Sequence, residues 1–243
     1  MNRRLTNLIL AATSGVFLAV FAASQETQPP TLTEQAAIQR VDGANQARYD
    51  KVLSFTDTEH YAVFRGDDEK NPAAEMTVHM TYRKGSGKSY QIVSQTGSQV
   101  IQKFGLEPLI ENERDINVPA KVQMSWLTSA NYEMHLKPGE TRQMGDASCV
   151  AIAIKPKRQA PNMVDGTLWI DPADGTVAEV EGVASKSPSI FAGTTRMMRE
   201  YTKVSGFSMA THARAESHNA LFGRTVVVID YSDYKLQLAE GQN

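Results

Sequence analysis

The sequence of 243 residues contains a single cysteine, Cys149, so the chain can form neither an internal disulfide nor a multi-cysteine metal site. It also lacks an excess of either charge, because 25 basic and 27 acidic side chains give a formal net charge of -2. This balance argues against a nucleic-acid-binding protein, which needs a basic surface. Hydrophobic residues make up 41% of the chain and charged residues 21%, which excludes a disordered chain and a protein with many membrane spans. Composition therefore predicts a soluble globular protein.

Complete catalytic and phosphate-binding motifs are also missing. The segment Gly85–Ser89 resembles the end of a phosphate-binding loop, but Tyr82 stands where the first glycine of that motif is required. Because strand-like runs lie on both sides of this segment, we interpret it as a hairpin turn. No Gly-x-Ser-x-Gly motif occurs, and Cys149 lies in an apolar run, where a buried and unreactive thiol is expected. The five histidines are not spaced as metal ligands: His60, His79, His135, His212 and His218. We therefore predict no catalytic residues, no metal site and no cofactor.

The first 24 residues have the layout of a secretory signal peptide. Arg3 and Arg4 precede a run from 8 to 23 that is almost entirely apolar, and Ala22-Ala23-Ser24 supplies small residues for cleavage. An uncleaved membrane anchor is the alternative, although the apolar run is short for a membrane span. No cysteine follows the run, so the chain itself is not expected to carry a lipid anchor. Residues 25–31, with two prolines, predict a flexible leader, and residues 32–243 a single domain.

Two helices are expected. Apolar residues recur at helical spacing from about Leu32 to Leu53, which predicts an amphipathic helix weakened by Gly43. A second helix is predicted from Glu107 to about Asp115, with a proline tolerated in its first turn.

Most of the remaining chain alternates between apolar and polar residues, the pattern of half-buried strands. In the run 76–82, Met76, Val78, Met80 and Tyr82 share one face. The predicted strands are 60–65, 76–82, 89–93, 99–104, 132–136, 149–155, 166–170, 177–183, 195–204, 209–216 and 225–236. Residues 171–175, Asp-Pro-Ala-Asp-Gly, predict a hairpin turn. The fold class expected is therefore mainly β, an antiparallel meander of ten or eleven strands.

Methionine is frequent, with ten in the chain and several within predicted strands. The methionine side chain is unbranched and polarizable, so it adapts to varied apolar partners. It fills irregular gaps in a core or lines a hydrophobic binding surface, and residue type alone favours the core.

Several runs together resemble a known family. They are Arg48 in the first helix, Ala74–Val78, Trp169–Gly182, Arg199–Val204, Leu221–Arg224 and Ile229–Tyr234. In these strands, turns and aromatic residues the sequence resembles the outer-membrane lipoprotein-sorting (LolA/LolB-like) superfamily, in its larger bacterial branch. The resemblance covers nearly all of the chain after the leader.

The resemblance implies a curved antiparallel sheet that forms an incomplete barrel, with an N-terminal helix and a short central helix covering its concave face. It also implies a periplasmic location and an apolar cavity that receives lipid acyl chains or lipoproteins. The candidate ligand-binding residues are Met76, Val78, Met80, Tyr82, Tyr90, Ile92, Met124, Trp126, Trp169 and Met197.

Three functions remain open at this point. The first is a periplasmic carrier or chaperone for lipids or lipoproteins. The second is an envelope sensor or adaptor that binds a protein partner through the same fold. The third and least favoured is a hydrolase, which requires titratable groups with perturbed pKa values clustered in the pocket.

Overall fold

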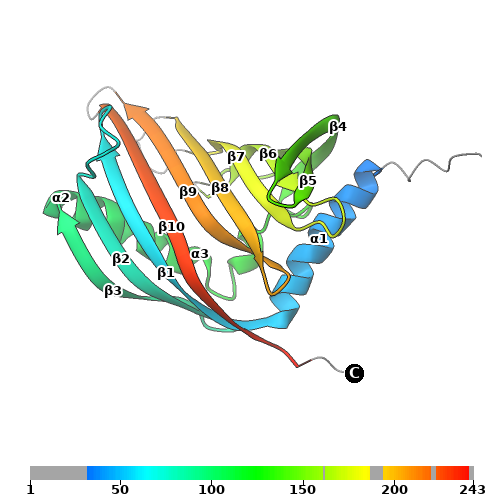
Figure 1. Cartoon of the computed structure of the whole chain (residues 1–243), viewed down its shortest axis with the longest axis horizontal. Coiled ribbons are helices and arrows are strands. Elements are labelled where there is room, and N and C mark those ends of the chain that lie inside the picture. The colour runs from blue at the N-terminus through cyan, green and yellow to red at the C-terminus, as the bar shows by residue number, and fades with distance from the viewer. Residues whose placement is uncertain (1–31, 161, 187–193, 220–222, 241–243) are drawn as a thin grey trace, which may run out of the picture. The chain divides into compact units, whose positions relative to one another are not determined.

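Ten strands form one antiparallel sheet in the computed structural model, which describes residues 32–160, 162–186, 194–219 and 223–240. The strands are β1 Val52–Arg65, β2 Ala74–Arg83, β3 Gly87–Gly97, β4 Tyr132–Met144, β5 Ala147–Pro156, β6 Val164–Ile170, β7 Val177–Ala184, β8 Thr195–Val204, β9 Phe207–Asn219 and β10 Gly223–Leu238. Their order is β3-β2-β1-β10-β9-β8-β7-β6-β5-β4, so the sheet is a meander in which β10 returns to pair with β1 (Figure 1). The sheet curves without closing into a barrel. The predicted signal peptide and leader lie outside the described residues, as do two residues of the family resemblance, Leu221 and Phe222.

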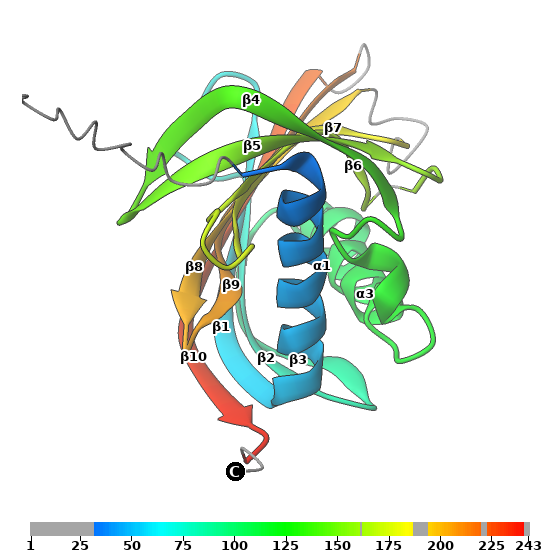
Figure 2. The same cartoon turned by 90° about the vertical axis from the view of Figure 1, so that its right-hand side faces the viewer.

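The helices lie on one face of the sheet (Figures 1 and 2). Helix α1 spans Glu34–Lys51, and the side chain of Thr33 caps it by accepting a hydrogen bond from the Ala36 amide at 3.2 Å. A helical stretch after β3 consists of α2 Gln99–Ile101, the π-helix η1 Gln102–Leu106 and α3 Glu107–Ile116. The short 3₁₀-helix η2, Val122–Ser125, lies in the connection from α3 to β4. The expected helical cover of the concave face is thus confirmed.

Some local predictions are wrong. Residues 99–104, predicted as a strand, are helical, because Ser98 caps the segment and the Gln102 amide group donates hydrogen bonds to the carbonyls of Glu75 and Thr96, both at 2.7 Å. The first helix ends at Lys51 and not at Leu53, since the chain passes directly from α1 into β1 at Val52. The predicted turn at Gly85–Ser89 is shorter than expected, because β2 ends at Arg83 and β3 already begins at Gly87. The predicted turn at 171–175 connects β6 to β7, as expected.

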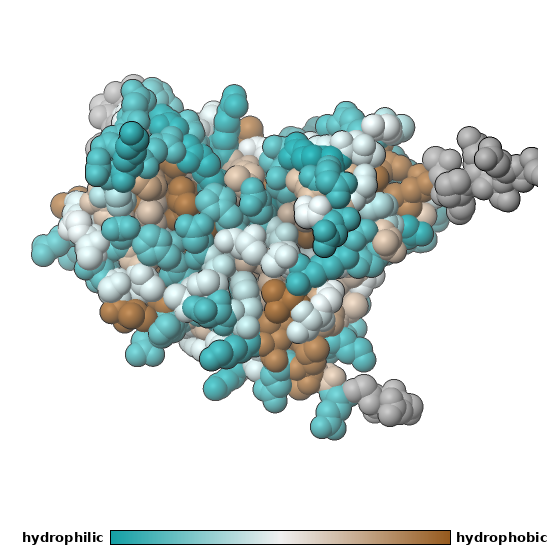
Figure 3. All heavy atoms as spheres, viewed as in Figure 1, coloured by the Kyte–Doolittle hydropathy of each residue, from teal (hydrophilic) through white to brown (hydrophobic). Residues whose placement is uncertain are grey.

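Each helical segment packs on a different part of the sheet. Ala37 and Val41 of α1 are buried against β4–β7, in a cluster that includes Leu168. Leu106 of η1 and Ile110 of α3 are buried against β1 and β2 in a second cluster. The face of the sheet turned away from the helices carries many polar side chains, and apolar side chains appear there in separate areas among them (Figure 3).

The turn between β6 and β7 docks against helix α1. Gly175 has a φ of +77°, and a Cβ at this position would lie 2.2 Å from the Arg40 carbonyl carbon. The Arg40 guanidinium in turn donates a hydrogen bond to the Pro172 carbonyl. Only glycine allows this close approach of turn and helix.

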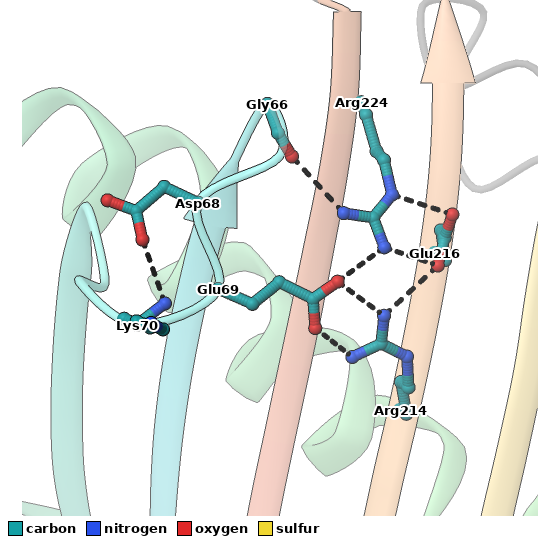
Figure 4. A network of polar contacts seen from close by, with 7 residues as sticks. All are labelled: Gly66, Asp68, Glu69, Lys70, Arg214, Glu216 and Arg224. Atoms are coloured by element: carbon teal, nitrogen blue, oxygen red, sulfur yellow. Dashed lines mark hydrogen bonds and ion pairs between the residues drawn. The ribbon is translucent and has the colours of Figure 1, made fainter.

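The loop between β1 and β2 is fixed by a network of ion pairs (Figure 4). Glu69 on the loop binds Arg214 of β9 at 2.8 Å and Arg224 of β10 at 2.5 Å, and Glu216 binds both arginines. Hydrogen bonds from the two arginines lower the pKa of Glu69 to about 2. These contacts hold the loop over the ends of β9 and β10.

Candidate functional site

A cavity of about 440 Å³ lies between the concave face of the sheet and the helices. Its walls come from α1, from α3, from the connection between α3 and β4, and from strands on both sides of β10. This volume falls within the range of about 300–1,000 Å³ found for small-molecule sites.

Apolar and aromatic side chains form much of the cavity wall. Three strands contribute methionines, Met80 from β2, Met197 from β8 and Met209 from β9. On the helical side, the rings of Tyr49 and Trp126 pack against each other with centroids 5.1 Å apart. Flexible thioethers and aromatic rings suit an apolar ligand of variable shape.

Two acidic residues of β1 also face the cavity. Asp57 is 4% exposed and Glu59 is 1% exposed, and both lie in phase with the buried Phe55 and Tyr61. Burial, together with the neighbouring Glu59, raises the pKa of Asp57 to about 7. Burial also raises the pKa of Glu59, although Lys88 and a hydrogen bond from the Tyr61 hydroxyl partly oppose this effect. Burial thus favours the protonated form of both carboxyl groups.

A buried ion pair joins β3 to α3 at the same wall. Lys88 Nζ lies 3.1 Å from Glu113 Oε2, and Arg199 of β8 lies 3.8 Å from Glu113 Oε1. Burial alone would raise the pKa of Glu113, but Lys88 and Arg199 outweigh it and hold this pKa below its ordinary value. Glu113 is therefore ionised and compensates the largely buried Lys88 and the partly exposed Arg199.

A third cation, Arg48, projects into the cavity from the last turn of α1. Its Nε atom is sealed from solvent and has no hydrogen-bond partner among the described residues. The guanidinium carbon lies 5.8 Å from the centre of the Phe55 ring. Burial lowers the pKa of Arg48, whereas the phenols of Tyr201, Tyr234 and Tyr82 oppose this effect.

The ten candidate ligand-binding residues occupy different places. Four of them line the cavity: Met80, Tyr82, Trp126 and Met197. Met76 and Val78 are on the same face of β2 but are buried beneath η1 and α3, and the half-buried Tyr90 packs beside them. Ile92 and Met124 are exposed, on β3 and η2 respectively.

Trp169 lies on the face of the sheet opposite to its neighbours Leu168 and Ile170. It packs with Cys149 and Ala151, and the Arg142 guanidinium lies 4.1 Å from the centre of its ring. Its indole N–H donates a hydrogen bond to Glu181 at 3.0 Å. Trp169 is therefore outside the cavity.

The charged residues of the cavity did not emerge from the sequence. We predicted a strand beginning at His60, whereas β1 begins at Val52 and carries Asp57 and Glu59 at inward positions. The signal was present in the alternation Phe55-x-Asp57-x-Glu59-x-Tyr61, which places two acids in phase with aromatic core residues. The convergence of Lys88, Glu113 and Arg199 depends on tertiary structure, and no local pattern reveals it.

Within the described parts of the chain, no group of three or more His, Cys, Asp or Glu side chains is placed to hold a metal ion. The helices among these residues are also too short or too polar to cross a membrane.

Protein-family models gave no match, and neither did curated proteins. Among solved structures, the chain is similar to a LolA superfamily protein from Nitrosomonas europaea, with 13% identity and a TM-score of 0.43 over 85% of this chain and 94% of that one. A DUF1329 family protein from Desulfovibrio piger shows 12% identity and a TM-score of 0.42 over 87% and 96%. A domain from Vibrio parahaemolyticus described as an outer membrane lipoprotein-sorting protein shows 11% identity and a TM-score of 0.44 over 86% and 93%.

Proposed function

We propose that this protein is an exported periplasmic binding protein that shields lipid acyl chains or lipoproteins in the cavity, as a carrier or chaperone. The observation that carries the proposal is the cavity itself, with methionines from β2, β8 and β9 on the sheet side and the Tyr49–Trp126 pair on the helical side. Its ligand carries an apolar chain, and its action is binding without catalysis.

The energetics favour such a ligand. Each methylene group moved from water into an apolar environment contributes about 0.8 kcal/mol, so an acyl chain supplies considerable affinity. The methionine side chains adapt their rotamers to a flexible chain at small cost.

The proposed location follows from the sequence. A basic start, a short apolar run and small residues at 22–24 favour export through a signal peptide that is then removed. After cleavage the protein would keep no membrane span, and its balanced charge does not favour nucleic acid as a partner.

A second candidate function is an envelope sensor or adaptor that binds a protein partner. It is favoured by exposed apolar side chains at the sheet edge and in the adjoining helical segment: Ile92, Val93, Val100 and Phe104. Phe104 is 73% exposed, and exposed apolar groups beside an edge strand are typical of interaction surfaces. Phe104→Ser should abolish capture of such a partner and leave ligand binding in the cavity unchanged.

A hydrolase is the least favoured alternative. The cavity does bring together titratable groups with shifted pKa values, as a hydrolase requires. Two serine hydroxyls on the wall, however, are engaged with the backbone: Ser125 donates to the Val122 carbonyl at 2.8 Å and Ser208 to the Val177 carbonyl at 2.9 Å. These contacts do not activate a nucleophile, which needs a neighbouring base.

Native mass spectrometry of the protein purified from its own host tests the proposal. A lipid or an acylated peptide should travel with the protein and should be released by organic solvent. Protein that carries no apolar molecule, and that also fails to bind a fluorescent fatty acid in solution, would contradict the carrier function.

A further inference from the structure

Arg48 differs from the other basic residues that face the cavity. Lys88 and Arg199 both pair with Glu113, and Arg214 pairs with Glu69 and Glu216. For Arg48, the described part of the chain offers no carboxylate partner, and its Nε is buried without a hydrogen bond. The groups that act on it electrostatically are the phenols of three tyrosines.

A guanidinium whose Nε is buried without a partner is unfavourable, because that atom has lost water without gaining a hydrogen-bond acceptor. Arginine cannot escape this cost by losing its proton, since the guanidinium stays protonated in proteins. The stacking of the group over Phe55 supplies only part of the lost solvation. A ligand that brings an anion to this position would restore the missing interaction.

The surroundings of Arg48 are suited to a molecule with two different ends. Val52, Phe55, Met80 and Met209 form an apolar cluster, and all four also line the cavity. Phe55 contacts both this cluster and the guanidinium. A ligand with its charged head group at Arg48 could therefore lay its apolar chain along this cluster on the sheet.

We propose that the cavity takes an amphiphile with an anionic head group, a carboxylate or a phosphate, and that Arg48 binds this head. This inference rests on the proposed carrier function and names the chemical class of its ligand. The planar guanidinium matches both oxyanions, because it can donate two parallel hydrogen bonds to either one. The acids that share the cavity do not oppose an anion strongly, since burial favours the neutral forms of Asp57 and Glu59 and Glu113 is paired with Lys88.

Isothermal titration with three twelve-carbon ligands tests the inference: laurate, dodecyl phosphate and dodecanol. These ligands have the same alkyl chain and differ in the head group, so differences among their affinities measure the effect of the head group's charge. Because hydrogen bonds to a charged group are strong, we expect wild type to bind at least one of the anions about tenfold or more tightly than dodecanol. If one anion binds more tightly than the other, its head group, carboxylate or phosphate, is the one that the site prefers. If laurate and dodecyl phosphate bind equally tightly, the site recognises the oxyanion that both share.

The variant Arg48→Met keeps an unbranched side chain and removes the charge. We expect it to bind laurate and dodecyl phosphate only as well as dodecanol, with dodecanol binding within about threefold of wild type. Lys51→Met removes an exposed positive charge from the same turn of α1 and should leave all three affinities unchanged. Thermal melting of each variant shows that the fold is intact.

The outcomes separate this inference from the carrier function. If wild type binds the three ligands equally, or if Arg48→Met weakens all of them alike, the inference is wrong and the carrier function stands. If wild type binds none of them, the carrier function itself fails. Even if Arg48→Met does not fold, the affinities of wild type for the three head groups show whether the cavity prefers an anionic ligand.

Discussion

The ammonium group of Lys88 lies 3.1 Å from the carboxylate of Glu113, and this buried ion pair joins an edge strand of the sheet to the helix that covers it. Both side chains are 17% exposed, so the pair is largely removed from solvent. Because Arg199 of β8 approaches the same carboxylate, Glu113 balances the positive charges of both Lys88 and Arg199.

Removing the Glu113 carboxylate should therefore destabilise the protein strongly. Glu113→Gln leaves Lys88 without its partner in a largely buried site, and breaking a buried pair in this way costs about 3–5 kcal/mol. Urea unfolding measures the loss. The control Glu111→Gln, on the same helix, removes an exposed partner of Arg114 and should change stability by less than about 0.5 kcal/mol. Equal losses in the two variants would show that the buried pair has no special role.

Asp57 should make stability depend on pH. Its pKa is about 7 in the folded protein, against about 3.9 in an unfolded chain, so the folded state holds its proton more tightly. Stability is therefore lost as the pH rises from about 4 to about 7, by up to about 4 kcal/mol. Asp57→Asn, which never ionises, should match wild type near pH 4 and exceed its stability at pH 8.

Urea unfolding of wild type and Asp57→Asn at several pH values measures this effect. Asp165→Asn is the control, because Asp165 is exposed on β6. This variant should follow wild type at every pH. A difference between wild type and Asp57→Asn that stays constant with pH would contradict the assignment.

Met80 and Thr81 alternate on β2, and only Met80 lines the cavity. Met80→Asp places an unpaired charge where an apolar chain would lie, so binding of a fluorescent fatty acid should weaken about tenfold or more. Thr81→Asp, on the opposite face, should bind as wild type does. Melting must be measured alongside, because a core role for Met80 predicts unfolding instead. Unfolding of Met80→Asp, or unchanged binding by it, would contradict this prediction.

The docking of the β6–β7 turn against α1 should tolerate no Cβ at Gly175. Gly175→Ala brings the new atom against the Arg40 backbone and also requires a positive φ, so we expect a loss of more than about 2 kcal/mol. Gly206→Ala also requires a positive φ, of +85°, but meets no atom within 4 Å, and should cost only about 1 kcal/mol. Thermal unfolding distinguishes the two. Similar losses would mean that the close approach is easily relaxed.

The sequence predicted the fold where local alternation decides it. Strand β8 has the predicted bounds, and α3 begins at the predicted residue, because in both cases the apolar pattern matches the element that forms. The segment 99–104 failed because distant groups determine its conformation. The Gln102 side chain binds two carbonyls of neighbouring strands, and no local pattern records those partners.

The site was only partly predictable. Alternation correctly places Met80 and Tyr82 on the concave face of β2, whereas it cannot show that α3 and η1 cover Met76 and Val78 on that same face. The charges of the cavity come from α1, β1, β3, α3, β8 and β9, which meet only when the sheet curves around the helices. Such convergence is a property of the tertiary fold.

The pairing of β1 with β10 has a consequence for how the chain folds. β10 lies between β1 and β9, and within the described sheet it provides the strand pairing that links β1–β3 to β4–β9. This contact joins residues far apart in the sequence, so the sheet cannot be completed until residues 223–238 have been synthesised. A chain that stops before them exposes two open sheet edges, at β1 and at β9, and open edges are where β-sheet proteins aggregate.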